Sequence, residues 1–361
     1  MNRPRQPSAS SRQHGLTIVE LMVGMVVALF VLAIISQVYL ASRNSYRFQS
    51  ASSRIQETAR FAMETIGQEV RNAGYQGCGA VTFTSNVLQG VTNASGTKPW
   101  WLDFGTSLQG YNSTTTFPAE LKNTLNQSPT SNSSAVVVLR GDSITERSVT
   151  AHNLTTSEIT VGAAHPYQTG EVLVATDCKQ AAIFRVTSVP VNTSVKHEQG
   201  AATHDNCYAE LGASCNSASG KVHQFGAGSL VSRLSSNAYF VAPSSTGTGN
   251  SLWTRSLAGQ NNAQPAAAIE LAPGVERLCA AFGVDSDGDG SANRFVAADQ
   301  VSASDWGQVV SVRFEILVRS SEDNVTPQQQ TYTVCGSDTT ATDKRLYKVY
   351  STTANVRNRT P

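Results

Sequence analysis

The chain has 361 residues, of which 40% are hydrophobic and 15% are charged, and its formal net charge is +1. This composition supplies enough apolar side chains for a folded core and excludes a disordered chain. The near-zero charge excludes a strongly basic nucleic-acid-binding domain. Because one long helical pattern precedes a series of strand patterns, we expect one long helix and one large globular domain.

Residues 1 to 15 are polar and basic, and residues 16 to 41 are apolar except for one acid, Glu20. A helix of about 20 residues crosses the hydrocarbon core of a bilayer, so the apolar run is long enough to span a membrane. The basic flank keeps the start of this run in the cytoplasm. The sequence lacks the short apolar run and small-residue cleavage site of a secretory signal peptide. The alternative is a plain signal anchor, in which an acid costs about 2.5 to 3.5 kcal/mol without benefit.

The segment HGLTIVEL, residues 14 to 21, resembles the leader junction of type IV prepilins. The resemblance implies that a prepilin peptidase of the membrane cuts after Gly15 and methylates the new N-terminus at Leu16. It also implies that Glu20 acts in assembly. Cleavage creates a cationic amine, which Glu20 of a neighbouring subunit can neutralise in a low dielectric.

The helical pattern continues beyond the apolar run, because apolar residues recur at steps of three and four: Ile55, Ala59, Ala62, Ile66 and Val70. This spacing predicts an amphipathic helix that lies on a globular core. We therefore expect a cleaved leader at 1–15, an apolar transmembrane half of the helix at 16–42, an amphipathic half at 43–74 and a periplasmic β-rich domain at 75–361.

The rest of the chain contains loops and strand patterns. Residues 81 to 134 are rich in Ser, Thr, Asn and Gly, which predicts long loops with short strands. Short β-rich runs follow at 135–139, 171–175, 183–189, 230–234 and 239–242. The clearest strand is predicted at 309–319, where apolar and polar residues alternate. These patterns predict an α+β fold, with an antiparallel sheet packed on the N-terminal helix.

Four further pieces are similar to the PilW minor pilins: Asp177-Cys178, VDSDGDG at 284–290, Asp305-Trp306 and NVRNR at 355–359. The resemblance implies a minor pilin that joins other minor pilins and the major pilin to prime or cap a type IV pilus. It implies a tip adhesin of the PilY type as a further partner. It also implies storage in the inner membrane with a periplasmic head, and then a place in the pilus at its tip. The nearest alternative is a J-like pseudopilin of type II secretion.

One of these pieces predicts a possible metal site. Asp285, Asp287 and Asp289 precede a glycine and form the first half of a calcium loop, in which neighbouring carboxylates converge on one cation. The bidentate acid expected at the twelfth position is missing, so Asn293 and Asp299 would have to complete the ligand shell. The alternative is a solvated turn in which aspartate and glycine supply only turn geometry.

The chain contains an even number of cysteines, and none is part of a C-x-x-C pair. Disulfides are therefore the expected state in an exported protein. Cys207 and Cys215 enclose a short loop and are the one pair we select. The pairing of the others is left open. The six candidates are Cys78, Cys178, Cys207, Cys215, Cys279 and Cys335.

No sequence signature of an enzyme is present, so we expect no catalytic residue and no cofactor other than calcium. Trp100 and Trp101 either cover a loop core or, in an alternative adhesin, form a platform for a sugar. Arg357 and Arg359 are expected in a solvated tail, with no nucleic-acid partner. Five histidines occur singly in polar stretches and are expected to be solvated: His152, His165, His197, His204 and His223.

Overall fold

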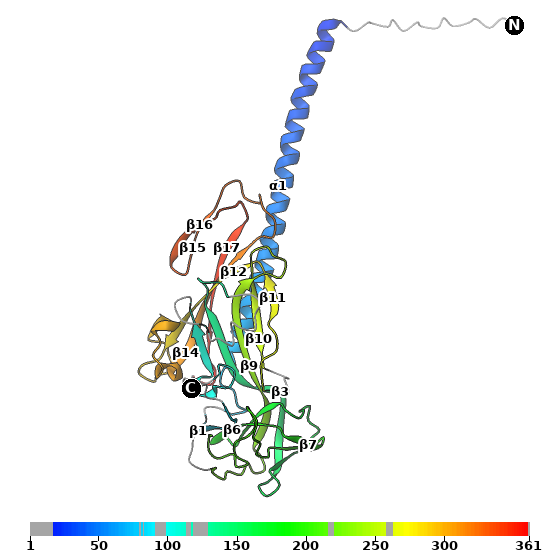
Figure 1. The fold of residues 1–361 in the computed structure, drawn as a ribbon. Coiled ribbons are helices and arrows are strands. Elements are labelled where there is room, and N and C mark those ends of the chain that lie inside the picture. Colours follow the sequence, from blue (N-terminus) through cyan, green and yellow to red (C-terminus); the bar gives the residue numbers. More distant parts are fainter. Residues whose placement is uncertain are drawn as a thin grey trace, which may run out of the picture.

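The computed structural model describes residues 17–78, 81, 83–90, 99–112, 117, 129–215, 220–257 and 263–359. Within them, one long helix, α1 (Ile18–Arg71), projects from a β-rich head (Figure 1). Its 54 residues correspond to about 80 Å of helix. The expected α+β architecture is present. The expected cleavage point between Gly15 and Leu16 lies outside the described residues.

The two halves of α1 differ in burial. The residues from Thr17 to Tyr46 are all exposed, whereas the predicted apolar stripe of the second half is buried in the head. Each buried isoleucine or valine of that stripe contributes about 1.5 to 3 kcal/mol. The helix ends at Arg71 with Asn72 as its C-cap, and Gly74 adopts a φ of 74° that favours glycine.

The head contains a large sheet of eleven strands. Its main path runs in the order β1-β6-β5-β9-β3-β4-β8-β7, while β10, β11 and β2 branch from it. The β1–β6 pair is parallel, and the other strand pairs of this sheet are antiparallel. In chain order the strands are β1 (Phe83–Asn86), β2 (Leu108–Tyr111), β3 (Ala135–Asn153), β4 (Glu158–Val161), β5 (Val172–Thr176), β6 (Gln180–Arg185), β7 (Ser188–Val191), β8 (Ser194–Lys196), β9 (Leu230–Pro243), β10 (Asn250–Ser256) and β11 (Ile269–Pro273).

A second, four-stranded antiparallel sheet has the order β13-β12-β14-β17. The amphipathic half of α1 shares one apolar core with this sheet and with β3, β9, β10 and β11. A separate two-stranded hairpin lies beside β17 (Figure 1). These strands are β12 (Val275–Val284), β13 (Arg294–Ala297), β14 (Val309–Arg319), β15 (Thr331–Val334), β16 (Ser337–Thr340) and β17 (Tyr347–Asn355). Short 3₁₀ turns occur at η1 (Phe104–Thr106), η2 (Ala298–Gln300) and η3 (Asp305–Gln308).

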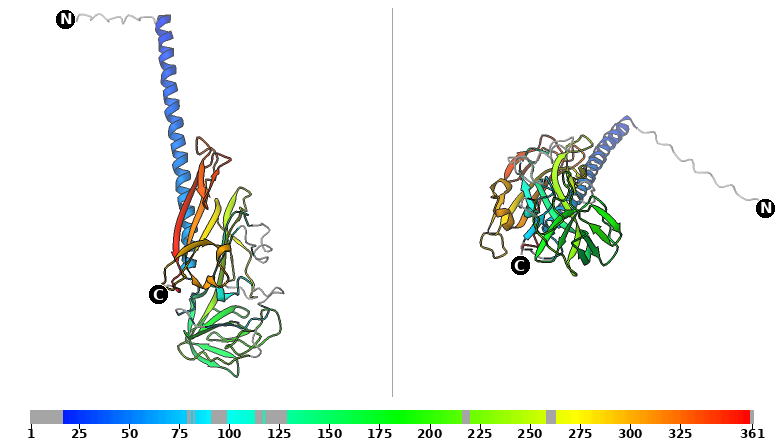
Figure 2. Two further views of the ribbon diagram at one scale, coloured as in Figure 1. Left: turned by 90° about the vertical axis from the view of Figure 1, so that its left-hand side faces the viewer. Right: turned by 60° about the horizontal axis from the view of Figure 1, so that its bottom comes forward.

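The far end of the head forms what we call the distal lobe, made of β1, β4 to β8 and the adjoining ends of β3 and β9. It has its own apolar core, which includes Ile159, Phe184, Val195 and Phe225. Figures 1 and 2 show this lobe beyond the end of α1, opposite the exposed half of the helix. The long strands β3 and β9 connect it to the rest of the head.

Three disulfides join the cysteines. Cys207 and Cys215, the pair selected from the sequence, are bonded to each other. Cys78 is bonded to Cys178, which links the segment after α1 to the β5–β6 turn. Cys279 of β12 is bonded to Cys335 in the β15–β16 turn. Each bond therefore attaches a loop or turn to the head.

Candidate functional site

The first turn of α1 positions Glu20. The backbone N–H of Thr17 donates to Glu20 Oε2 at 3.2 Å, and the backbone N–H of Glu20 donates to Thr17 Oγ1 at 3.2 Å. This reciprocal capping box folds the carboxylate back towards the start of the helix. An acid at this end also interacts favourably with the helix dipole. Glu20 is thus exposed beside Thr17, at the start of the helix.

The apolar half of α1 offers a second functional feature. The helix is long and apolar enough to cross a membrane. Because its first 29 described residues are exposed, from Ile18 to Tyr46, their side chains require lipid or neighbouring helices in place of water. Such a segment can anchor the head and can also pack into a helical bundle.

The head is fixed to α1 by a buried polar junction. Arg140 of β3 donates two hydrogen bonds to Glu69 of α1, from Nη2 at 2.9 Å and from Nε at 3.1 Å. Asn237 of β9 adds a third, from Nδ2 to Glu69 Oε2 at 3.0 Å. The Arg140 and Glu69 side chains are only 18% and 15% exposed, so this pairing is shielded from water. Pattern reading of the sequence did not identify this junction, since its members are far apart in the chain.

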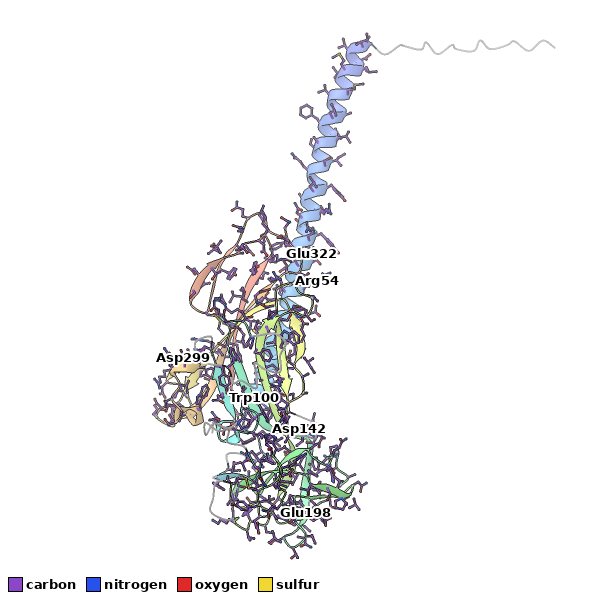
Figure 3. All side chains as sticks on the ribbon, in the orientation of Figure 1. Arg54, Trp100, Asp142, Glu198, Asp299 and Glu322 are labelled. Atoms are coloured by element: carbon purple, nitrogen blue, oxygen red, sulfur yellow. A yellow bond between two sulfur atoms is a disulfide. The ribbon has the colours of Figure 1, made fainter. Side chains whose placement is uncertain are left out.

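Nearer the exposed half, a loop of the head contacts α1 through charged groups. Glu322 lies 3.7 Å from Arg47 and 4.0 Å from Arg54, and Figure 3 shows Arg54 and Glu322 at this level. Arg47 also donates to the carbonyl of Asp323. These ion pairs are solvent-exposed and contribute little individually. They nevertheless fix the loop against the helix at the point where it leaves the head.

The C-terminal tail is not solvated as expected, because it closes over the end of α1. The Arg357 N–H donates to the carbonyl of Arg71, and Asn358 Nδ2 donates to the carbonyl of Ala73. Arg359 donates to the carbonyls of Trp306 and Val309. Two of the PilW-like pieces, Asp305-Trp306 and the tail, therefore meet in space. Burial lowers the pKa of Arg359 to about 10, so it stays charged at neutral pH.

The acidic loop connects β12 to β13. Oxygens of Asp285, Asp287 and Asp289 lie within 4.8 Å of one another. The Asp285 carboxylate also accepts the N–H groups of Gly288 and Gly290, at 2.7 and 2.8 Å. Desolvation opposes the effect of these bonds, but together the backbone donors hold the pKa of Asp285 below its usual value. The three acids thus converge in a loop that is already folded.

Asn293 and Asp299 have different positions relative to this loop. Asn293 Oδ1 accepts the N–H of Ser286 at 2.7 Å, and its Nδ2 donates to Asp287 Oδ2 at 3.0 Å. Asn293 therefore faces the acids. Asp299 accepts a hydrogen bond from Asn112 at 2.7 Å and is not part of the group of converging acids. The expectation that Asp299 helps to complete the shell finds no support in this geometry.

The expectation that the histidines are solvated is wrong for three of them. His152, His197 and His204 are buried, and the Nε2 atoms of His152 and His197 lie 3.0 Å apart. The Phe225 N–H donates to His152 Nδ1, so the proton of His152 is on Nε2 and is donated to His197. This contact joins β3 to the segment after β8 and locks the distal lobe. Because the two histidines are 45 residues apart, no local pattern indicates their pairing.

Trp100 and Trp101 are also inside the head, as one of the two alternatives predicted. They are 2% and 3% exposed and their rings make an edge contact at 5.5 Å. Trp101 Nε1 donates to the carbonyl of Ala263 at 3.1 Å. Figure 3 places Trp100 within the head. Buried rings offer no face to a sugar, so the adhesin platform built from these two residues is excluded.

The fold and this site define a class of protein. Residues 10–36 match the family model described as the prokaryotic N-terminal methylation motif. Together with the exposed apolar helix, the capping-box acid and the β-rich head, this match supports a type IV pilin-like architecture.

The C-terminal part of the head matches a second family model. Residues 238–358 match the family model described as Type IV Pilus-assembly protein W, so this part of the chain is similar to the PilW family. The matched region runs from β9 through the acidic loop to the tail, and it leaves β4 to β8 of the distal lobe outside. No curated protein and no solved structure matches the chain.

Proposed function

We propose that the chain is a minor pilin that primes or caps a type IV pilus, acting as a structural subunit without catalysis. Prepilin peptidase would cut between Gly15 and Leu16 and methylate the new amine. Glu20 would then neutralise the amine of a neighbouring subunit, because two opposite charges attract strongly where lipid and apolar helices exclude water. The capping box supports this role, since it already directs the carboxylate towards the start of the helix.

The position of the distal lobe is the observation that favours the pilus tip. If the helices of the proposed filament pack roughly along the fibre axis, the next subunit towards the tip would occupy the space beyond the end of α1. The distal lobe fills that space (Figure 1). A subunit of this shape is accommodated most easily where no further copy must stack above it, which is the tip.

The proposed role as a minor pilin implies particular partners and particular cellular locations. The subunit would wait in the inner membrane, with its apolar helix half in the bilayer and its head in the periplasm. It would associate with other minor pilins and the major pilin through α1, and the distal lobe would face a tip adhesin of the PilY type. Three disulfides suit an oxidising compartment.

We also retain calcium as a proposed ligand of the acidic loop. Asp285, Asp287 and Asp289 supply converging hard oxygen ligands. Asn293 would add its Oδ1 only after its amide group turned, because that oxygen accepts the N–H of Ser286 and Nδ2 faces Asp287. The absence of a twelfth-position acid favours the weak binding that is typical of extracellular calcium modules, with dissociation constants of about 0.1 to 1 mM. A bound ion would fix the turn between β12 and β13.

A comparison of Glu20→Ala with the parent tests the assembly role. The variant should still be cleaved at Leu16 but should enter sheared pili far less than the parent, and cells should carry fewer pili. Glu64→Ala is the matched control, because Glu64 is an exposed acid elsewhere on α1. Normal pilus number and composition in Glu20→Ala would argue against the proposal. Loss of protein secretion with intact pili would assign the chain to a type II secretion pseudopilus.

A further inference from the structure

A cleft of about 670 Å³ lies over the outer face of the four-stranded sheet. Alternate residues of β12 and β14, such as Leu278 and Phe314, pack towards α1, so their neighbours point to the opposite face. The cleft is bounded by residues 295–297 of β13, by loop residues that include Asn112 and by the Cys279–Cys335 disulfide. It lies outside every site described above.

Arg313 of β14 contributes a positively charged side chain to this cleft. Its guanidinium carbon lies 4.8 Å from the centre of the Phe295 ring, which orients the planar group. The side chain is exposed, and Arg313 has no carboxylate partner within the part of the chain that the structure describes. An oriented guanidinium of this kind presents a fork that fits a carboxylate in a bidentate manner.

Glu315 is the anion of the same face. Its Oε2 accepts the N–H of Cys335 at 2.6 Å, which fixes the side chain beside the disulfide. Arg313 and Glu315 are two residues apart on one strand, so they are separated by about 7 Å along the sheet. The spacing of same-face side chains in an extended peptide is the same. The cleft therefore presents a cation and an anion with the same spacing as alternate side chains on one face of a β-strand.

The chemistry of the lining favours a peptide over a sugar. A sugar ring needs an aromatic face, but the Phe295 face is covered by Arg313. A peptide needs hydrogen-bonding groups, which Asn112, Asn132 and Gln300 supply around the cleft.

We propose that this cleft binds an extended segment of a partner protein. An acidic side chain of the segment pairs with Arg313, and a donor two residues further on pairs with Glu315. The ligand class is a short peptide of mixed charge, and the binding mode is strand-like. The site is on the side of the head, so it is separate from the α1 surface that would mediate helix packing. It would add a specific lateral contact to the assembly.

Fluorescence anisotropy with the full chain in detergent micelles tests this proposal. The probe is a labelled hexapeptide with a glutamate and a lysine two residues apart, and the matched probe has glutamine in place of the glutamate. The first peptide should bind about tenfold more tightly than the second, because one charge-assisted pair is lost. This comparison requires no change in the protein, so it does not depend on the folding of a variant.

Arg313→Gln should abolish the preference between the two peptides, while Arg60→Gln on the exposed face of α1 should leave it intact. Equal affinity of the parent for both peptides would overturn the proposal. Failure of the charged peptide to bind at about 1 mM would also overturn it, since a dissociation constant above that value is very weak. Displacement of the probe by glucuronate at lower concentrations than by unlabelled peptide would identify a sugar site instead.

Discussion

The guanidinium of Arg140 and the carboxylate of Glu69 form a two-point hydrogen-bonded pair between β3 and α1. Because Asn237 occupies the same carboxylate, one acid of the helix connects it to two strands of the large sheet. The pair lies near the end of α1 and fixes this end of the helix to the large sheet.

Arg140→Ala should therefore loosen the helix from the head. Removal of one partner leaves the other charge largely buried without a partner, which costs about 2 to 4 kcal/mol. Hydrogen exchange of the full chain in micelles should show faster exchange in the last turns of α1. Arg60→Ala is the control, because Arg60 is exposed on the same helix. Equal exchange in the two variants would contradict the role of the pair.

The His152–His197 pair predicts that the distal lobe loses stability in acid. Burial, with a contribution from neighbouring histidines, lowers the pKa of His152 to about 4 and that of His197 to about 3. Both are neutral in the fold, whereas an unfolded histidine titrates near pH 6.5. Their contribution is therefore complete above about pH 6.5 and is lost as the pH falls towards 4. The loss between pH 7.5 and 5 should be about 2 kcal/mol for each histidine.

Hydrogen exchange in β4 and β8 at these two pH values measures this effect. Protonation at either acceptor nitrogen breaks a hydrogen bond, from Phe225 N–H to His152 or from His152 to His197. A double variant, His152→Gln with His197→Gln, should be less stable at neutral pH but should show a flatter pH dependence. The same slope in the parent and in the double variant would show that other groups cause the acid sensitivity.

Arg359→Ala tests the closure of the tail over α1. The substitution leaves the carbonyls of Trp306 and Val309 without their donor, so we expect a loss of about 2 to 3 kcal/mol in unfolding free energy. Arg357→Ala should have little effect, because Arg357 contributes a backbone hydrogen bond and its side chain is exposed. Thermal unfolding of both variants compares them directly. Similar midpoints would mean that the buried guanidinium adds no stability.

Calorimetric titration of the full chain with calcium tests the acidic loop. The parent should bind one ion with a dissociation constant of about 0.1 to 1 mM, and Asp287→Ala should abolish the signal. Asp338→Ala in β16 is a matched control, since it removes an exposed aspartate outside the loop. A titration of the parent without binding heat would mean that the loop binds no calcium and is only a turn held by its own hydrogen bonds.

The sequence predicted local features of the fold well, because they depend on periodicity. The buried stripe of α1 and the strand at 309–319 both occur as predicted. Two runs predicted separately at 230–234 and 239–242 form the single strand β9, since the intervening polar residues are buried by strand pairing. The run at 183–189 is instead divided between β6 and β7.

Features that depend on distant pairing were not predictable from local patterns. β3 continues to Asn153, far beyond the predicted run at 135–139, because β9 and β4 pair with its polar half. The hydrogen bonds of Arg359 depend on carbonyls that are 50 and 53 residues away in the chain. At the candidate site, the leader motif and the convergence of the three acids could be derived from sequence, whereas the Arg140–Glu69 junction and the cleft at Arg313 could not.

Mass spectrometry of purified, sheared pili tests the central claim most directly. The account predicts that this chain is present at low copy number relative to the major pilin, and that it begins with an N-methylated Leu16. Replacement of Gly15 by a bulky residue should leave the leader attached and remove the chain from the pili. Absence of the parent chain from intact pili, or a chain that still begins at Met1 within them, would contradict the account.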